Sequence, residues 1–143
     1  MPLTTPEVRH RRRARARVIQ ALYAWDLAPH GSLVRTADRV WDDLAVSADD
    51  REFARPIIAI LDEHLSEIDA GLTDVADNWR LERMGVIDRS VLRMAAAELR
   101  RGFTPARAVM QEAVTLAERF GSSRSARFVN GVIDAYARRL GAL

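Results

Sequence analysis

The feature that most constrains the fold is the helical spacing of apolar residues along nearly the whole chain. Apolar side chains recur at intervals of three and four residues, and no stretch alternates between apolar and polar positions as a half-buried strand does. Because an amphipathic helix buries its apolar stripe against other helices, this spacing predicts an all-α fold. A chain of 143 residues is long enough to bury one such core.

Turn and cap residues divide the pattern into seven helices. They are expected at about 8–28, 33–46, 49–64, 65–80, 87–101, 105–120 and 124–140. Pro56 should bend the third helix or set its start, and Thr104 should cap the sixth helix ahead of Pro105. Since the loops are short, consecutive helices should pack as antiparallel neighbours in a bundle.

Charge is segregated along the chain, although the formal net charge is only +2. Residues 1–28 and 80–143 are basic, whereas residues 29–79 carry twelve acids and four arginines. All 22 basic residues are arginine, whose planar guanidinium suits phosphate, although a GC-rich genome would produce the same bias. The asymmetry predicts a nucleic-acid surface built from the two ends of the chain.

The first predicted helix combines an apolar stripe with an arginine-rich outer face. Six arginines fall within residues 9–17, and Val18, Leu22 and Trp25 belong to the stripe. Tyr23 projects on the arginine side, which suits single-stranded RNA because cations pair with phosphates and a ring stacks on an unpaired base. The alternative is that Tyr23 packs on a neighbouring helix with its hydroxyl at the rim.

The last predicted helix repeats this arrangement. Its core stripe leaves Phe128 at the edge beside Arg124, while Arg127 faces outward. Gly131 lies in the middle of this helix, where glycine costs about 1 kcal/mol relative to alanine. We therefore expect a neighbouring helix or a nucleotide to approach its backbone closely.

The sequence contains few residues that could form a catalytic or metal site. The chain has no cysteine, and its three histidines share no ligand spacing. Glu98 projects into an apolar arc, where it could be a general acid with Glu112 as its partner or a structural carboxylate that accepts from an arginine. We favour the structural role, because no nucleophile elbow, phosphate loop or zinc motif accompanies it. No enzymatic activity, cofactor or metal is expected.

The sequence predicts a cytoplasmic protein. No apolar run approaches the length of a membrane span. The arginine cluster and the apolar residues after it imitate a signal or transit peptide, but Gln20, Trp25 and Asp26 interrupt the apolar run. The absence of cysteine agrees with a reducing compartment.

Three blocks of sequence resemble the NusB family of bacterial transcription antitermination factors. They are "RRRARARVIQALYAWDL" at 11–27, "LERMGVIDRSVLRMAAAEL" at 81–99 and "PARAVMQEAVTLAERFGSSRSARFVNGVIDAYA" at 105–137. The acidic middle of the chain matches only in helical pattern. The resemblance implies a seven-helix protein of two packed three-helix subdomains, at about 8–64 and 65–140, without catalytic activity.

The resemblance also implies a function and a set of site residues. The protein would bind boxA single-stranded RNA of ribosomal RNA leader transcripts together with NusE, a small-subunit ribosomal protein, in an RNA polymerase antitermination complex. Glu82 and Asp88 match acidic family positions that face NusE. The predicted RNA-binding residues are those that match the family's RNA surface, together with two arginines of the last helix: Arg11, Arg12, Arg13, Arg15, Tyr23, Arg124, Arg127 and Phe128.

One departure from the family affects the predicted RNA affinity. Family members commonly carry acids just before "FVNG", where this chain has Ser123 and Arg124. The loss of negative charge should strengthen phosphate binding and steepen its salt dependence. It puts in doubt how strongly RNA binding depends on NusE.

Two other functions fit the same residues. One is a substrate-binding module related to ribosomal RNA cytosine methyltransferases, although 143 residues leave nothing to bind S-adenosylmethionine. The other is a helical protein–protein adaptor that never touches RNA. Deletion of residues 9–17 is expected to abolish boxA binding and leave helicity nearly intact. The sequence leaves open whether the free protein is a monomer or a homodimer, which RNA sequence it prefers, and what the acidic residues 38–77 do.

Overall fold

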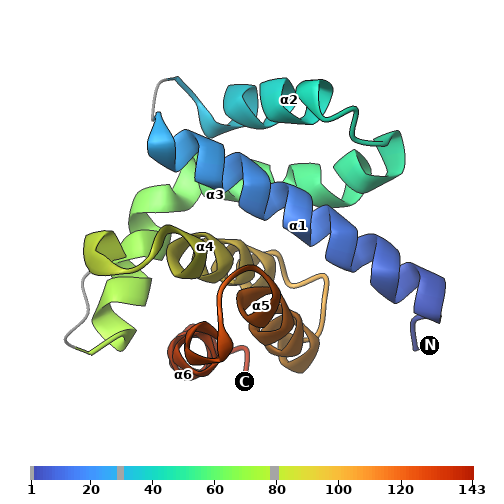
Figure 1. The fold of residues 1–143 in the computed structure, drawn as a ribbon. Coiled ribbons are helices and arrows are strands. Elements are labelled where there is room, and N and C mark those ends of the chain that lie inside the picture. Colours follow the sequence, from blue (N-terminus) through green and yellow to red (C-terminus); the bar gives the residue numbers. More distant parts are fainter. Residues whose placement is uncertain (1, 29–30, 78–80) are drawn as a thin grey trace.

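The computed structural model describes residues 2–28, 31–77 and 81–143, and the all-α prediction is confirmed for them. In these ranges the chain forms six α-helices and one short 3-10 helix, without a strand. They are α1 (Thr5–Leu27), α2 (Leu33–Asp43), α3 (Ala48–Val75), η1 (Leu81–Arg83), α4 (Val86–Arg101), α5 (Ala106–Phe120) and α6 (Ser123–Leu140). In Figure 1, α2 lies above α1, α5 and α6 lie at the bottom, and α4 lies between them.

The third and fourth predicted helices form one element, α3, so the described chain has six α-helices rather than seven. The backbone of α3 leaves helical dihedrals at His64 (φ −120°, ψ 21°), where the two helices were predicted to meet. Pro56 does not set the start of this element, which begins at Ala48, and the break in helical geometry falls at His64 instead. The predicted helix ends at 29–30 and at 78–80 lie outside the described residues.

The cap predicted at Thr104 is wrong. Pro105 occupies the N-cap position of α5, and no side chain caps that helix. The hydroxyl of Thr104 instead donates to Oε1 of Glu98 at 2.9 Å, inside the protein. The buried carboxylate is the stronger acceptor for this hydroxyl, because charged acceptors form stronger hydrogen bonds than neutral ones.

On the two sides of His64, α3 forms hydrogen bonds with α2 and with α4. In the N-terminal half, Oδ1 of Asp62 accepts from the backbone N–H of Leu33 at the start of α2, at 2.8 Å. In the C-terminal half, both carboxylate oxygens of Asp69 accept from Arg93 of α4, at 2.9 and 2.8 Å. We propose that the break at His64 marks the border between the predicted subdomains 8–64 and 65–140.

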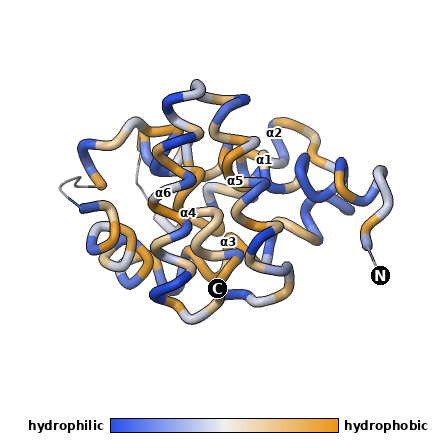
Figure 2. Tube along the Cα trace, turned by 90° about the horizontal axis from the view of Figure 1, so that it is seen from below, coloured by the Kyte–Doolittle hydropathy of each residue, from blue (hydrophilic) through white to orange (hydrophobic). Residues whose placement is uncertain are grey.

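The helix α4 lies in the centre of the core. Every residue from Ser90 to Leu99 is buried, including Arg93 and Glu98. A helix that is buried all round needs cover on every side, and α4 contacts α1, α3, α5 and α6. Figure 2 shows that polar residues dominate the N-terminal part of α1, which extends away from this core. In the part of the chain that the structure describes, no helix has the length and apolar character needed to cross a membrane.

Candidate nucleic-acid interface

Arg15 lies inside the protein, away from the RNA-facing surface on which it was predicted. Its side chain is 3% exposed. Its Nε and Nη2 donate to the two carboxylate oxygens of Glu98 on α4, at 2.7 and 2.5 Å, and its Nη1 reaches Glu112 on α5 at 3.4 Å. The structural role of Glu98 as an acceptor from an arginine is confirmed. Because the guanidinium of Arg15 is enclosed and paired, we remove it from the RNA-binding set.

Arg12 and Arg13 lie nearer the surface, and each is held by a carboxylate. Arg12 donates from Nε and Nη2 to Glu112 at 3.0 and 2.7 Å, and Arg13 donates from the same atoms to Asp50 at 2.8 and 3.1 Å. The hydrogen bonds to Glu112 and Asp50 raise the pKa of Arg12 and Arg13. The bidentate pairs link α1 to α5 and to the first turn of α3. Each of these cations therefore already has a counter-ion.

Arg11 contacts aromatic rings in place of a carboxylate. Its Cζ lies 5.2 Å from the ring centre of Phe53 and 5.1 Å from that of Phe103. Arg101 covers Phe103 from 4.5 Å. The sequence analysis did not single out Phe53, Phe103 or Arg101, and no spacing in the sequence would have placed them beside Arg11.

Tyr23 lies on the outer face of α1, with 42% of its surface exposed. It follows Arg12 by eleven residues, which is close to three helical turns, so the two side chains leave α1 on the same side. This exposure agrees with a ring that faces outward, and the alternative in which Tyr23 packs on a neighbouring helix with its hydroxyl at the rim stays open. The ring is accessible to a partner.

The start of α6 presents the second group of predicted residues. Arg124 and Arg127 are exposed, and neither forms an ion pair with any residue in the described ranges. Phe128 is half-buried against the core. Arg124 and Phe128 line a pocket of about 430 Å³, and the wall from the start of α4 includes Asp88. The structure thus brings a residue predicted to face NusE next to two residues predicted to face RNA.

Asp88 has an unusual environment in this pocket. Its Oδ1 is buried and receives no hydrogen bond within the described chain. A buried carboxylate oxygen without a donor is costly, and a donor from a partner molecule would relieve that cost. This favours a contact surface at the start of α4.

Gly131 does not serve helix packing in the described part of the molecule. A Cβ built at Gly131 would meet nothing within 4 Å. The glycine lines a groove of about 500 Å³ together with Phe128, Arg127 and the end of α3. Of the two predicted reasons for this glycine, approach by a neighbouring helix is not observed, and approach by a nucleotide stays a prediction.

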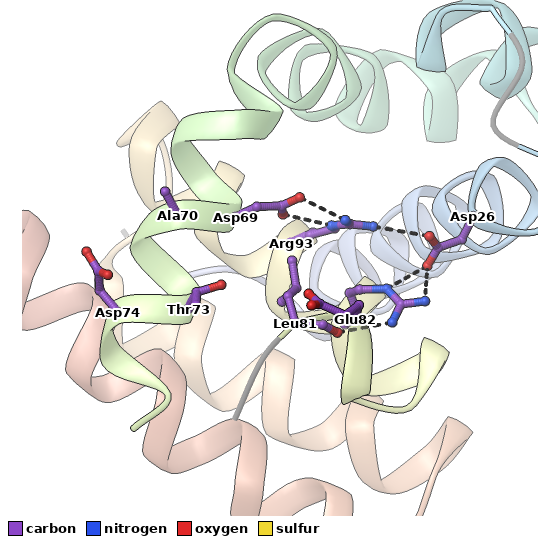
Figure 3. Close-up of a pocket in the computed structure, with 9 residues that line it drawn as sticks. Asp26, Asp69, Ala70, Thr73, Asp74, Leu81, Glu82 and Arg93 are labelled. Carbon is purple, nitrogen blue, oxygen red and sulfur yellow. Dashed lines mark hydrogen bonds and ion pairs between the residues drawn. The ribbon is translucent and has the colours of Figure 1, made fainter. Parts of the chain in front are cut away.

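Glu82 lies in η1 at a different pocket, of about 540 Å³, which Figure 3 shows. Asp26 accepts there from Arg89 at 2.8 Å, and Arg93 lies between Asp26 and Asp69. Four carboxylates and two arginines line this pocket. Three of these carboxylates, those of Asp26, Asp69 and Asp74, are paired with arginines, Asp74 with Arg139 at 2.8 Å. Glu82 and Asp88 therefore belong to two separate pockets.

The site offers binding chemistry through cations, exposed rings and carboxylates. In the described ranges, no group of three histidine or acidic side chains is arranged to hold a metal ion. Neither Glu98 nor Glu112 is available as a general acid on an open cleft, since both are held by arginines. The arrangement can neutralise phosphates, stack on bases and dock a protein.

Comparison with known proteins gives a consistent result. The NusB family model matches residues 12–138. The transcription antitermination protein NusB of Solibacter usitatus is 40% identical over 133 residues, which span 91% of this chain and 90% of that protein. The NusB of Anaeromyxobacter dehalogenans is 38% identical over 131 residues, which span 91% of this chain and 92% of that protein.

Solved structures agree with the sequence relatives. The T. maritima NusB structure superposes with a TM-score of 0.81 at 33% identity, over 90% of each chain. A crystal structure of antitermination factors NusB and NusE in complex with double-stranded RNA superposes with a TM-score of 0.82 at 26% identity. That alignment covers 92% of this chain and 98% of the other.

Proposed function

The chain belongs to the NusB family, and from this membership we propose that it is an RNA-binding transcription antitermination factor. Its relatives are named for antitermination, and one solved relative is a complex of NusB and NusE with RNA. The proposed ligand is boxA-type RNA of ribosomal RNA leader transcripts, the proposed protein partner is NusE, and the proposed setting is the RNA polymerase complex in the cytoplasm. The proposed activity is binding, without catalysis.

The observation that carries the proposal is the pocket between the start of α4 and the start of α6. Within the described residues, Arg124 supplies a cation there without a counter-ion, Phe128 supplies an aromatic ring, and Asp88 supplies a carboxylate whose Oδ1 lacks a donor. The cation suits phosphate, the ring suits a base, and the carboxylate suits a basic or hydrogen-bonding partner. In our proposal, RNA and NusE meet at this pocket.

We propose a revised set of RNA-binding residues. Arg124, Arg127, Tyr23 and Phe128 form its centre, because the first three are exposed and the half-buried Phe128 lines the same pocket as Arg124. Arg12 and Arg13 contribute less than their number suggests, since each already neutralises a carboxylate. The solved relative holds double-stranded RNA, whereas exposed aromatic rings suit unpaired bases, so we expect this chain to prefer single strands.

The test is salt-dependent binding of a boxA-type RNA, measured by fluorescence anisotropy with and without NusE. The double variant Arg124→Ala/Arg127→Ala should make the slope of log affinity against log salt shallower by about 1.4, at ~0.7 for each lost phosphate contact to a single strand. The matched control is Arg35→Ala/Arg39→Ala on α2, which removes two exposed arginines elsewhere. Binding of NusE without any binding of RNA would identify a protein adaptor instead.

Deletion of residues 9–17 is a poor test of this proposal. It would remove Arg15 from the interior along with the surface arginines. Glu98 would then be left as a buried charge without its partner, which destabilises a protein strongly. We therefore expect this deletion to reduce helicity as well as RNA binding.

A further inference from the structure

Phe103 is an exposed aromatic residue that is held in place from several sides. It lies in the loop between α4 and α5, directly after Gly102, and 55% of its surface is exposed. The guanidinium groups of Arg11 and Arg101 lie 5.1 and 4.5 Å from its ring centre. The ring of Phe53 meets it edge to face, with centroids 6.4 Å apart and an interplanar angle of 68°. Phe103 is thus a largely exposed residue whose ring is contacted by two arginines and by a second ring.

The two arginines at this ring differ from their neighbours in α1. Arg12, Arg13 and Arg15 are bound to carboxylates. Arg11 and Arg101 form no ion pair in the described ranges, although Arg11 interacts electrostatically with Glu7 one turn earlier and Arg101 donates to the carbonyl of Phe53 at 3.5 Å; both also contact the rings. Their positive charge remains available to a phosphate. An aromatic ring flanked by such arginines is the combination with which proteins bind single-stranded nucleic acids.

A cleft of about 320 Å³ lies beside the ring, and it is partly acidic. Glu7, Asp49 and Glu52 line it together with the arginines and the two phenylalanines. These carboxylates disfavour a phosphate inside the cleft. They can, however, accept hydrogen bonds from the amino group of a nucleobase, as acidic side chains do with cytosine. The cleft therefore suits a base whose phosphate stays on the arginine side.

We propose that Phe103, held by Arg11 and Arg101, is a stacking site for one unpaired nucleobase. This inference rests on the proposed RNA-binding function and adds a third ring to Tyr23 and Phe128. Arg11 precedes Tyr23 by twelve residues, which is about 18 Å along α1 and about 120° around its axis, so an RNA strand would turn around α1 between the two sites. The Phe103 site therefore binds RNA beyond the segment that contacts Tyr23, and it lengthens the bound strand.

The experiment compares a boxA-type RNA with the same RNA extended by a short run of cytidines at its 5′ or its 3′ end. At one of the two ends, the extension should raise the affinity of the unmodified protein. Phe103→Ala should reduce affinity for that extended RNA by roughly fivefold to a hundredfold, the range expected for loss of one stacked base. It should not alter affinity for the unextended RNA. Phe103→Tyr, which keeps a ring, should retain the gain.

Phe120→Ala is the matched control, because Phe120 is also exposed but has no arginine over its ring. A second readout is ultraviolet crosslinking of RNA with 5-iodouridine in the extension, which should label the peptide containing Phe103. The inference is overturned if the unextended RNA binds but neither extension adds affinity, or if Phe103→Ala loses no more than Phe120→Ala. Loss of NusE binding alone in Phe103→Ala would also overturn it. If the unmodified protein binds no RNA at all, the proposed function itself fails.

Discussion

The starts of α1 and α6 look alike in sequence and differ in structure. Both carry arginines beside an aromatic residue, and both were predicted to face RNA. In α1, three arginines are bound to carboxylates of α3, α4 and α5. In α6, Arg124 and Arg127 pair with no carboxylate in the described ranges.

This difference shows that a basic cluster can serve packing rather than binding. Arg12, Arg13 and Arg15 fasten α1 to three other helices and are neutralised by the carboxylates they hold, whereas Arg9, Arg11 and Arg17 form no ion pair in the described ranges. The charge that RNA can use is what remains after internal ion pairs are formed. By that measure only half of the six arginines in residues 9–17 count toward the proposed RNA surface, whereas both arginines at the start of α6 do.

The largest expected effect comes from breaking the buried pair in α1. Glu98→Ala should lower the free energy of unfolding by about 3–5 kcal/mol, because it leaves the guanidinium of Arg15 buried without a counter-ion. Urea denaturation followed by circular dichroism measures this loss. Asp42→Asn, which breaks an exposed pair with Arg51, should change stability by no more than about 1 kcal/mol. Equal losses of unfolding free energy in the two variants would show that the buried Arg15–Glu98 pair contributes no more to stability than an exposed pair.

The next largest effect is a difference between Arg124 and Arg13 in how strongly each contributes to the salt dependence of RNA binding. Arg124→Ala should lower the salt slope of RNA binding by about 0.7. Arg13→Ala should lower it by less than half as much, because Arg13 already neutralises Asp50. Titrations of a single-stranded RNA at several salt concentrations measure both slopes. The comparison between the two helices fails if Arg13→Ala produces the greater change.

A smaller effect is expected when the counter-ion of Arg13 is removed. Asp50→Asn should release Arg13 and steepen the salt slope by up to about 0.7, with a gain in RNA affinity. Asp43→Asn removes an exposed acid of α2 that contacts no arginine in the described chain, so it controls for the change in net charge. A loss of affinity in Asp50→Asn would mean that Asp50 positions Arg13 for RNA.

The smallest effect concerns the first turn of α1. The backbone N–H and the hydroxyl of Thr4 hold the pKa of Glu7 below its ordinary value. A lowered pKa in the folded state means that Glu7 stabilises the turn above its unfolded pKa and loses this effect as the pH falls through the folded value. The protection factors for amide hydrogen exchange in the first turn, which correct for the intrinsic pH dependence of exchange, should therefore fall at acidic pH. In Glu7→Gln this dependence should vanish, and a variant that kept it would point to another group.

Much of the fold could be predicted from the sequence, because apolar spacing and cap residues act locally. Arg15 could also have been predicted to be buried, since it precedes Val18, Ile19 and Leu22 by three, four and seven residues and all three are buried. Glu98, already expected in an apolar arc, is the matching acceptor. The local spacing of apolar residues therefore indicated that both Arg15 and Glu98 are buried.

The cluster at Phe103 could not have been predicted in this way. Arg11 meets Phe103 only because α4 places its following loop beside the start of α1, and no periodicity encodes that placement. The shared pocket of Asp88 and Arg124 has the same origin, since it depends on how α4 and α6 pack. Contacts between residues that are distant in the sequence can be predicted only when the fold is known.

The pairing of Arg15 also has a consequence for the order of folding. Its counter-ion Glu98 is synthesised 83 residues later, and Glu112 follows 97 residues after Arg15. Until α4 leaves the ribosome, docking α1 would bury a guanidinium with nothing to neutralise it, which is costly. The first helix to be made therefore docks stably only after α4 has been made, and the proposed RNA surface on α1 matures only when the C-terminal half of the chain has been translated.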